Sequence, residues 1–172
     1  MMKRFKAAVT ILLCLLLCGC GKSKTAEVAD TNGDGVLSCT LEIRCDTLLG
    51  KQNELTEGKA ALVPEDGTLL SATKVEFAGG DSVFDVFRQT LREKKIHFEY
   101  VDASAYDSVY IEGIGNLYEF DCGPQSGWMY SVNGVYPGLG CSAYALADGD
   151  VIAFSYTCDL GADLGAKKVY EK

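Results

Sequence analysis

Eight cysteines in a chain of 172 residues constrain this protein more than any other feature of its sequence. Cytosolic proteins keep their thiols reduced, so this many cysteines predicts an oxidising compartment unless they bind a metal. A zinc site is disfavoured, because no two cysteines have the Cys-x-x-Cys spacing and His97 is the only histidine. We therefore predict an exported protein with disulfide bonds and no metal site.

The N-terminus has the features of a secretory signal peptide over residues 1–19. Three basic residues, Lys3, Arg4 and Lys6, precede an apolar run at 7–17. Eleven helical residues are too short to cross a hydrocarbon core of roughly 30 Å, so a retained transmembrane helix is the weaker interpretation.

The end of this run resembles a bacterial lipobox, in which a small residue precedes a cysteine that receives a diacylglycerol. Gly19 followed by Cys20 fits that pattern, whereas Cys18 would place Leu17 in the small-residue position. We predict lipid attachment at Cys20 and a location on the extracytoplasmic face of the cell membrane. A plain secreted protein cleaved nearby is the alternative.

Charge and composition predict how the remaining chain is organised. Removing residues 1–19 takes away three positive charges and lowers the formal charge from −8 to about −11, which argues against a nucleic-acid partner. Residues 20–37 are polar and lack hydrophobic periodicity, so they are predicted to be the lipid anchor and a flexible tether. The folded domain is expected at 38–165, followed by a tail at 166–172.

The tether contains the first half of a calcium-binding loop at residues 30–35, DTNGDG. Leu41 stands at the twelfth position, where such a loop needs a bidentate glutamate. An acidic, turn-rich linker is therefore the favoured interpretation, with calcium binding as the alternative.

The domain is predicted to be rich in β-structure with one helix. Alternating apolar residues predict a strand at 39–45. Asp81 is the predicted N-cap of an amphipathic helix, whose apolar stripe extends to about Lys95. Asn133-Gly134 is typical of a type I′ hairpin turn. Further strands are expected at 68–78, 96–101, 108–114, 116–121, 128–132 and 151–158.

This order of elements predicts an α+β fold with a β-grasp-like mixed sheet and one amphipathic helix packed across it. In that arrangement the first and last strands run side by side in parallel at the centre of the sheet. Their C-terminal ends would then align, which predicts a disulfide between Cys45 and Cys158. Cys122 and Cys141 form the remaining predicted pair, and Cys39 is left over.

The segment from Glu112 to Gly134, with SGWMYSVNG at 126–134, resembles the bacterial DUF4430 family, described as transcobalamin-like C-terminal domains. The likeness continues through Gly140-Cys141 and residues 148–161 and spans roughly Thr40 to Leu164. It implies a β-grasp-like module related to the small C-terminal domain of the animal vitamin B12 carriers.

In those carriers the aromatic strand and the following hairpin touch one face of the corrin. The resemblance therefore implies Trp128, Tyr130, Asn133 and Tyr136 as candidate ligand-binding residues. An aromatic cluster that only stabilises the hairpin is the alternative. The carriers enclose cobalamin with a large helical domain that this chain does not supply, so weak binding is expected.

No set of residues predicts catalysis, because a lone histidine without an activated serine or cysteine makes no triad. We expect a non-enzymatic lipoprotein, anchored in the bilayer by acylated Cys20, that captures a small flat ligand. That ligand is a corrinoid (cobalamin-like) for uptake by a membrane transporter, and no other cofactor is expected. A cell-surface module that binds protein or glycan in adhesion is the alternative.

Overall fold

The computed structural model describes residues 36–103 and 108–166. The predicted signal peptide, the lipidation site Cys20, the acidic segment at 30–35 and residues 167–172 lie outside the described residues. Everything below concerns the described part of the chain. No helix within it is both long and apolar enough to cross a membrane.

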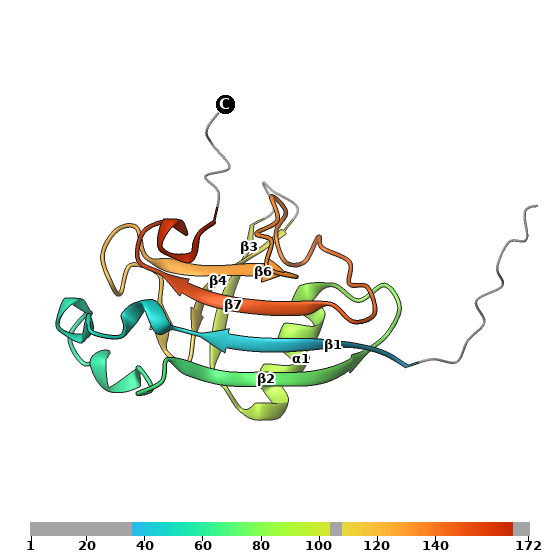
Figure 1. The fold of residues 1–172 in the computed structure, drawn as a ribbon, viewed down its shortest axis with the longest axis horizontal. Coiled ribbons are helices and arrows are strands. Elements are labelled where there is room, and N and C mark those ends of the chain that lie inside the picture. The colour runs from blue at the N-terminus through green and yellow to red at the C-terminus, as the bar shows by residue number, and fades with distance from the viewer. Residues whose placement is uncertain (1–35, 104–107, 167–172) are drawn as a thin grey trace, which may run out of the picture. The chain divides into compact units, whose positions relative to one another are not determined.

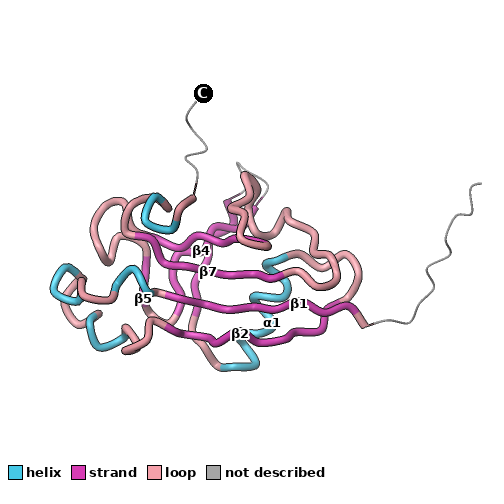
Figure 2. The backbone as a smooth tube through the Cα atoms, in the orientation of Figure 1, coloured by secondary structure: helices cyan, strands magenta, loops and turns pink. Residues whose placement is uncertain are grey.

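Seven strands form two sheets (Figure 1). The four-stranded sheet has the order β2-β1-β7-β6, and the three-stranded sheet has the order β3-β4-β5. The first sheet contains β1 (Leu37–Arg44), β2 (Thr68–Phe77), β6 (Gly127–Val132) and β7 (Val151–Thr157). The second contains β3 (Phe98–Ala103), β4 (Ser108–Ile114) and β5 (Leu117–Tyr118). Figure 2 shows that loops gather at the two ends of the four-stranded sheet. Short 3₁₀ turns lie at Asp46–Leu48, Gln52–Glu54, Ala60–Leu62 and Ala162–Leu164.

The predicted parallel pairing of the first and last strands is confirmed. Strand β1 lies beside β7 in parallel, with Leu41 opposite Ile152 and Ile43 opposite Phe154. All four side chains are buried, as the alternating pattern of each strand predicts. The α+β class with a mixed sheet is therefore confirmed, with the addition of a separate antiparallel three-stranded sheet.

Helix α1 (Val83–Lys94) begins one residue later than predicted. Ser82 is the N-cap, because its Oγ accepts from the Asp85 amide at 3.2 Å while the Asp85 carboxylate accepts from the Ser82 amide at 3.1 Å. Asp81, the predicted cap, instead accepts a hydrogen bond from the Ala78 amide at 2.9 Å and closes the preceding turn.

The apolar face of α1 contacts both sheets. The Phe87 ring lies 4.4 Å from Phe154 of β7 and 5.3 Å from Phe98 of β3, measured between ring centroids. Phe84 packs edge-on against Tyr100 at 4.8 Å. Phe84 and Phe87 are therefore core residues, and the helix joins the two sheets into one hydrophobic core.

The strand expected at 116–121 and the hairpin expected at Asn133-Gly134 are both less extensive in the structure. The strand expected at 116–121 ends at Tyr118, because the Asp121 carboxylate accepts the Tyr118 amide at 2.7 Å and Phe120 takes a positive φ of 67°. Asn133 and Gly134 have the positive φ angles of the predicted type I′ turn, but beyond them only Val135 pairs back, as an isolated bridge to Val132.

Candidate ligand-binding site

Strand β6 places two of the predicted site residues on one face of the four-stranded sheet. Trp128 pairs with Tyr156 of β7, and Tyr130 pairs with Phe154. The Trp128 ring meets Tyr156 edge-on at 5.2 Å, and the Tyr130 ring stacks on Phe154 at 5.8 Å. Residues two apart on a strand share a face, so β6 and β7 together present a continuous aromatic surface.

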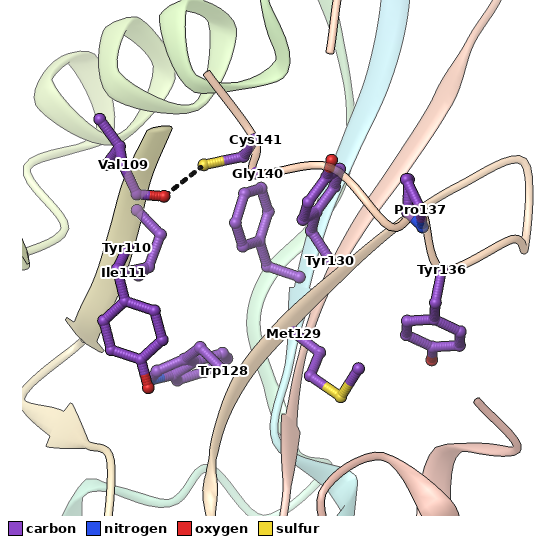
Figure 3. Close-up of a pocket in the computed structure, with 11 residues that line it drawn as sticks. Val109, Tyr110, Ile111, Trp128, Met129, Tyr130, Tyr136, Pro137, Gly140 and Cys141 are labelled. Atoms are coloured by element: carbon purple, nitrogen blue, oxygen red, sulfur yellow. Dashed lines mark hydrogen bonds between the residues drawn. The ribbon is translucent and has the colours of Figure 1, made fainter. Parts of the chain in front are cut away.

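A pocket of about 210 Å³ opens beside this surface. Its walls come from β4, β6, β7 and the loop at 136–141. Figure 3 shows Tyr110 and Trp128 on one side, Tyr136 and Pro137 on the other, and Tyr130 between them. The lining residues are Val109, Tyr110, Ile111, Trp128, Met129, Tyr130, Tyr136, Pro137, Gly140, Cys141 and Phe154.

The loop after β6 is held in place by helix α1 and strand β4. The Cys141 carbonyl accepts from the Phe84 amide at 3.1 Å, so it satisfies one of the N–H groups left open at the helix N-terminus. The Ser142 Oγ accepts from the Val109 amide of β4 at 3.0 Å. Gly140 packs so closely on β4 that a Cβ atom there would lie 1.5 Å from the Ser108 Oγ. A side chain at position 140 would therefore push this wall away from β4.

Trp128 is a wall of the pocket rather than an exposed platform. Its side chain is buried, with 7% of its surface accessible, and its Nε1 donates to the Leu117 carbonyl at 2.9 Å. Together with the edge contact to Tyr156, this places Trp128 in the hydrophobic core. The structure therefore favours the packing interpretation of this residue.

Tyr130 and Tyr136 border the pocket where the loop crosses β6. The Tyr130 hydroxyl donates to the Leu139 carbonyl at 2.6 Å and so ties the loop to the strand. Burial raises the pKa of Tyr130, and burial followed by the nearby Asp163 carboxylate raises the pKa of Tyr136. Both phenols are therefore neutral at physiological pH.

The remaining lining is also uncharged. Burial raises the pKa of the Cys141 thiol to about 11, and burial followed by the hydrogen bond to Glu119 raises the pKa of Tyr110. None of the lining residues carries an ionised side chain. The pocket is suited to an apolar group or the uncharged face of a ring system.

Asn133 lies outside this pocket, unlike the other three predicted binding residues. Its amide nitrogen donates to Asp150 Oδ1 at 2.8 Å, and its amide oxygen accepts from the Val151 amide at 2.9 Å. Both ends of the side chain therefore fasten the type I′ turn to the start of β7. Asn133 acts in the fold and does not face the site.

Strand β4 contributes three lining residues that the sequence did not indicate, Val109, Tyr110 and Ile111. Their alternation predicts the strand, but nothing in the sequence places that strand against β6. Phe154 was recognised only as part of a strand, and it becomes a lining residue because it pairs with Tyr130.

Cys39, Cys45, Cys122, Cys141 and Cys158 are free thiols in the structure, and the predicted Cys45–Cys158 and Cys122–Cys141 bonds stay predictions. The Cys141 Sγ contacts the Val109 carbonyl at 3.8 Å. The Cys158 Sγ contacts the Thr47 carbonyl at 3.8 Å, two residues beyond Cys45.

In the described part of the chain, His97 makes hydrogen-bond contacts with neighbouring side chains. His97 lies 3.1 Å from the Glu99 carboxylate and 3.2 Å from the Tyr118 hydroxyl on the surface of the three-stranded sheet. Within residues 36–103 and 108–166, no three His, Cys, Asp or Glu side chains are grouped so that they could hold a metal ion.

The sequence profile of the family described as domain of unknown function DUF4430 matches residues 80–158. Residues 80–158 therefore match the DUF4430 family. The match begins just before α1 and ends at Cys158, so it covers β3 to β7 and the whole pocket, whereas β1 and β2 precede it.

Two solved structures align with this chain at low sequence identity, and the first of them shares its fold. Haptocorrin in complex with Cbi aligns with a TM-score of 0.53 and 14% identity, over 72% of this chain and 25% of the haptocorrin chain. The match therefore spans about a quarter of the length of haptocorrin. A proposed metal-binding protein from Ruminococcus gnavus ATCC 29149 aligns with a TM-score of 0.42 and 12% identity, over 70% of this chain and 96% of that one. Among curated protein sequences, none matches this chain.

The position of Trp128 can be tested directly, because it is the only tryptophan. We expect acrylamide to quench its fluorescence several-fold less efficiently in the native protein than in the urea-unfolded chain, since the ring is packed on Tyr156. Equal quenching constants in the two states would show an exposed ring and contradict the structure.

Proposed function

We propose that this protein is an extracytoplasmic lipoprotein, anchored through Cys20, whose DUF4430 domain binds a small ligand and performs no catalysis. The candidate ligand is a corrinoid, delivered to a membrane transporter. The observation that carries the proposal is the uncharged aromatic pocket between β4, β6 and the loop at 136–141. The pocket lies on the strand and loop that the family resemblance implies for corrin contact.

The surroundings of the pocket favour a ligand larger than the pocket itself. Val135 and Leu139, in the loop that leaves β6, are 66% and 57% exposed. Large apolar side chains on a surface loop are available to cover the apolar face of a ring system. Haptocorrin, which shares the fold, is seen with Cbi (cobinamide), and this supports a corrinoid as the first ligand to test.

The size of the pocket sets the expected affinity. Pockets that enclose drug-sized ligands have volumes of roughly 300–1,000 Å³, whereas this one has about 210 Å³. It can therefore take up an edge or a substituent of a corrinoid but cannot enclose one. We expect a dissociation constant in the micromolar range or weaker, because one face of the ligand stays in water.

Binding is tested by isothermal titration calorimetry of the domain with cobinamide. Tyr136→Ala removes a ring that lines the pocket. We expect it to weaken binding roughly tenfold, or about 1.4 kcal/mol. Val101→Ala, on the exposed face of β3, is the matched control and should leave the affinity unchanged.

Two results would count against this function. Titration to millimolar cobinamide without heat would exclude corrinoid binding and favour the protein- or glycan-binding alternative. Equal losses in Tyr136→Ala and Val101→Ala would show that binding does not use this pocket.

Lipid anchoring is tested by cell fractionation. We expect Cys20→Ala to release the protein from the membrane fraction, because the thiol that receives the lipid is gone. Cys18→Ala is the control and should leave the protein in the membrane fraction. Retention of Cys20→Ala in the membrane would disprove the proposed anchor.

A further inference from the structure

Cys122 and Cys158 are brought together where β6 and β7 end. Gly127 and Thr157 are the last residue pair at this end of the two strands, and Cys158 is the next residue along the chain. Beyond the last pair, the Leu160 amide donates to the Gln125 carbonyl at 3.0 Å. The backbone of the turn before β6 therefore lies directly against the backbone that follows β7.

The turn itself is folded so that Cys122 faces this junction. The Cys122 amide donates to the Ser126 Oγ at 3.0 Å, and the same Oγ lies 3.0 Å from the hydroxyl of buried Tyr156. These contacts fix both ends of the 122–126 turn over the end of β7. Because Gly127 pairs with Thr157, Ser126 and the turn that holds Cys122 lie next to Cys158 at this end of the sheet.

Cys158 differs from the other four described cysteines in its exposure. Cys39, Cys45, Cys122 and Cys141 are buried, whereas Cys158 is only partly buried. An external disulfide can therefore reach the Cys158 sulfur first.

We propose that Cys122 and Cys158 are joined by a disulfide when the protein meets an oxidising disulfide, and that the other three described cysteines stay reduced. This inference does not depend on corrinoid binding. It replaces both of the bonds predicted from the sequence, because it uses one cysteine from each of them.

The reaction is a thiol–disulfide exchange with an external protein or small-molecule disulfide as the oxidant. The Cys158 thiolate attacks one sulfur of that disulfide, forms a mixed disulfide and releases the first external thiolate. The Cys122 thiolate then attacks the Cys158 sulfur and releases the second. The two cysteines lose two protons and two electrons, and the oxidant is reduced to two thiols.

The bond would hold together three segments that are distant in sequence. It fastens the turn before β6 to the end of β7, beside the Thr47 carbonyl. Cross-linking positions 122 and 158 also restricts the unfolded chain. The oxidised protein should therefore unfold at a higher temperature than the reduced protein.

The test is oxidation of the purified domain with glutathione disulfide, followed by non-reducing peptide mapping and thermal unfolding. We expect a Cys122–Cys158 linked peptide and a melting temperature roughly 10 °C above that of the reduced protein. Cys158→Ser and Cys122→Ser should each abolish this redox-dependent shift. Cys158→Ser is the safer variant because Cys158 is the more exposed residue.

Cys45→Ala is the matched control, since Cys45 is the partner that the sequence predicted for Cys158. It should keep both the linked peptide and the shift in melting temperature. Three results would overturn the proposal: a Cys45–Cys158 peptide, a Cys122–Cys141 peptide, or free thiols at 122 and 158 in folded protein after oxidation.

Discussion

The parallel pairing of β1 with β7 is the contact on which the rest of the structure depends. It joins residues more than a hundred positions apart, and the Thr40 amide donates to the Asp150 carbonyl at 2.8 Å where the pairing begins. Along it, buried Leu41 and Ile43 face Ile152 and Phe154 across the ladder. Because Phe154 also packs on Phe87 of α1, the helix is placed by the same pairing that closes the sheet.

The pocket is a consequence of this arrangement. Strand β7 fixes β6 at the edge of the sheet, and α1 fixes the loop at 136–141 through the Cys141 carbonyl. The Tyr130 hydroxyl and the Trp128 indole N–H both donate hydrogen bonds to backbone carbonyls, so these two walls of the pocket are held in place. Neither side chain carries a charge. A ligand therefore meets a preformed surface, which lowers the entropic cost of binding but restricts it to apolar chemistry.

Patterns local in sequence predicted most of the fold, and the family resemblance predicted three of the eleven lining residues of the pocket, Trp128, Tyr130 and Tyr136. Alternation in β1 and β7 and the stripe around Phe87 identified the elements, because periodicity reports which face of an element is buried. Contacts between distant segments could not be predicted in this way. The approach of β4 to β6 and the approach of the 122–126 turn to Cys158 arise from packing between elements. For that reason the sequence did not indicate Val109 as a lining residue.

We propose that the aromatic pocket between β4, β6 and the loop at 136–141 is the ligand-binding site of this protein. Amide and indole chemical shifts of ¹⁵N-labelled protein during a cobinamide titration test it most directly. The account predicts shift changes confined to residues 109–111, 128–130 and 136–141, including the Trp128 indole. Changes centred on the far sheet edge at β2, or none at millimolar cobinamide, would contradict it.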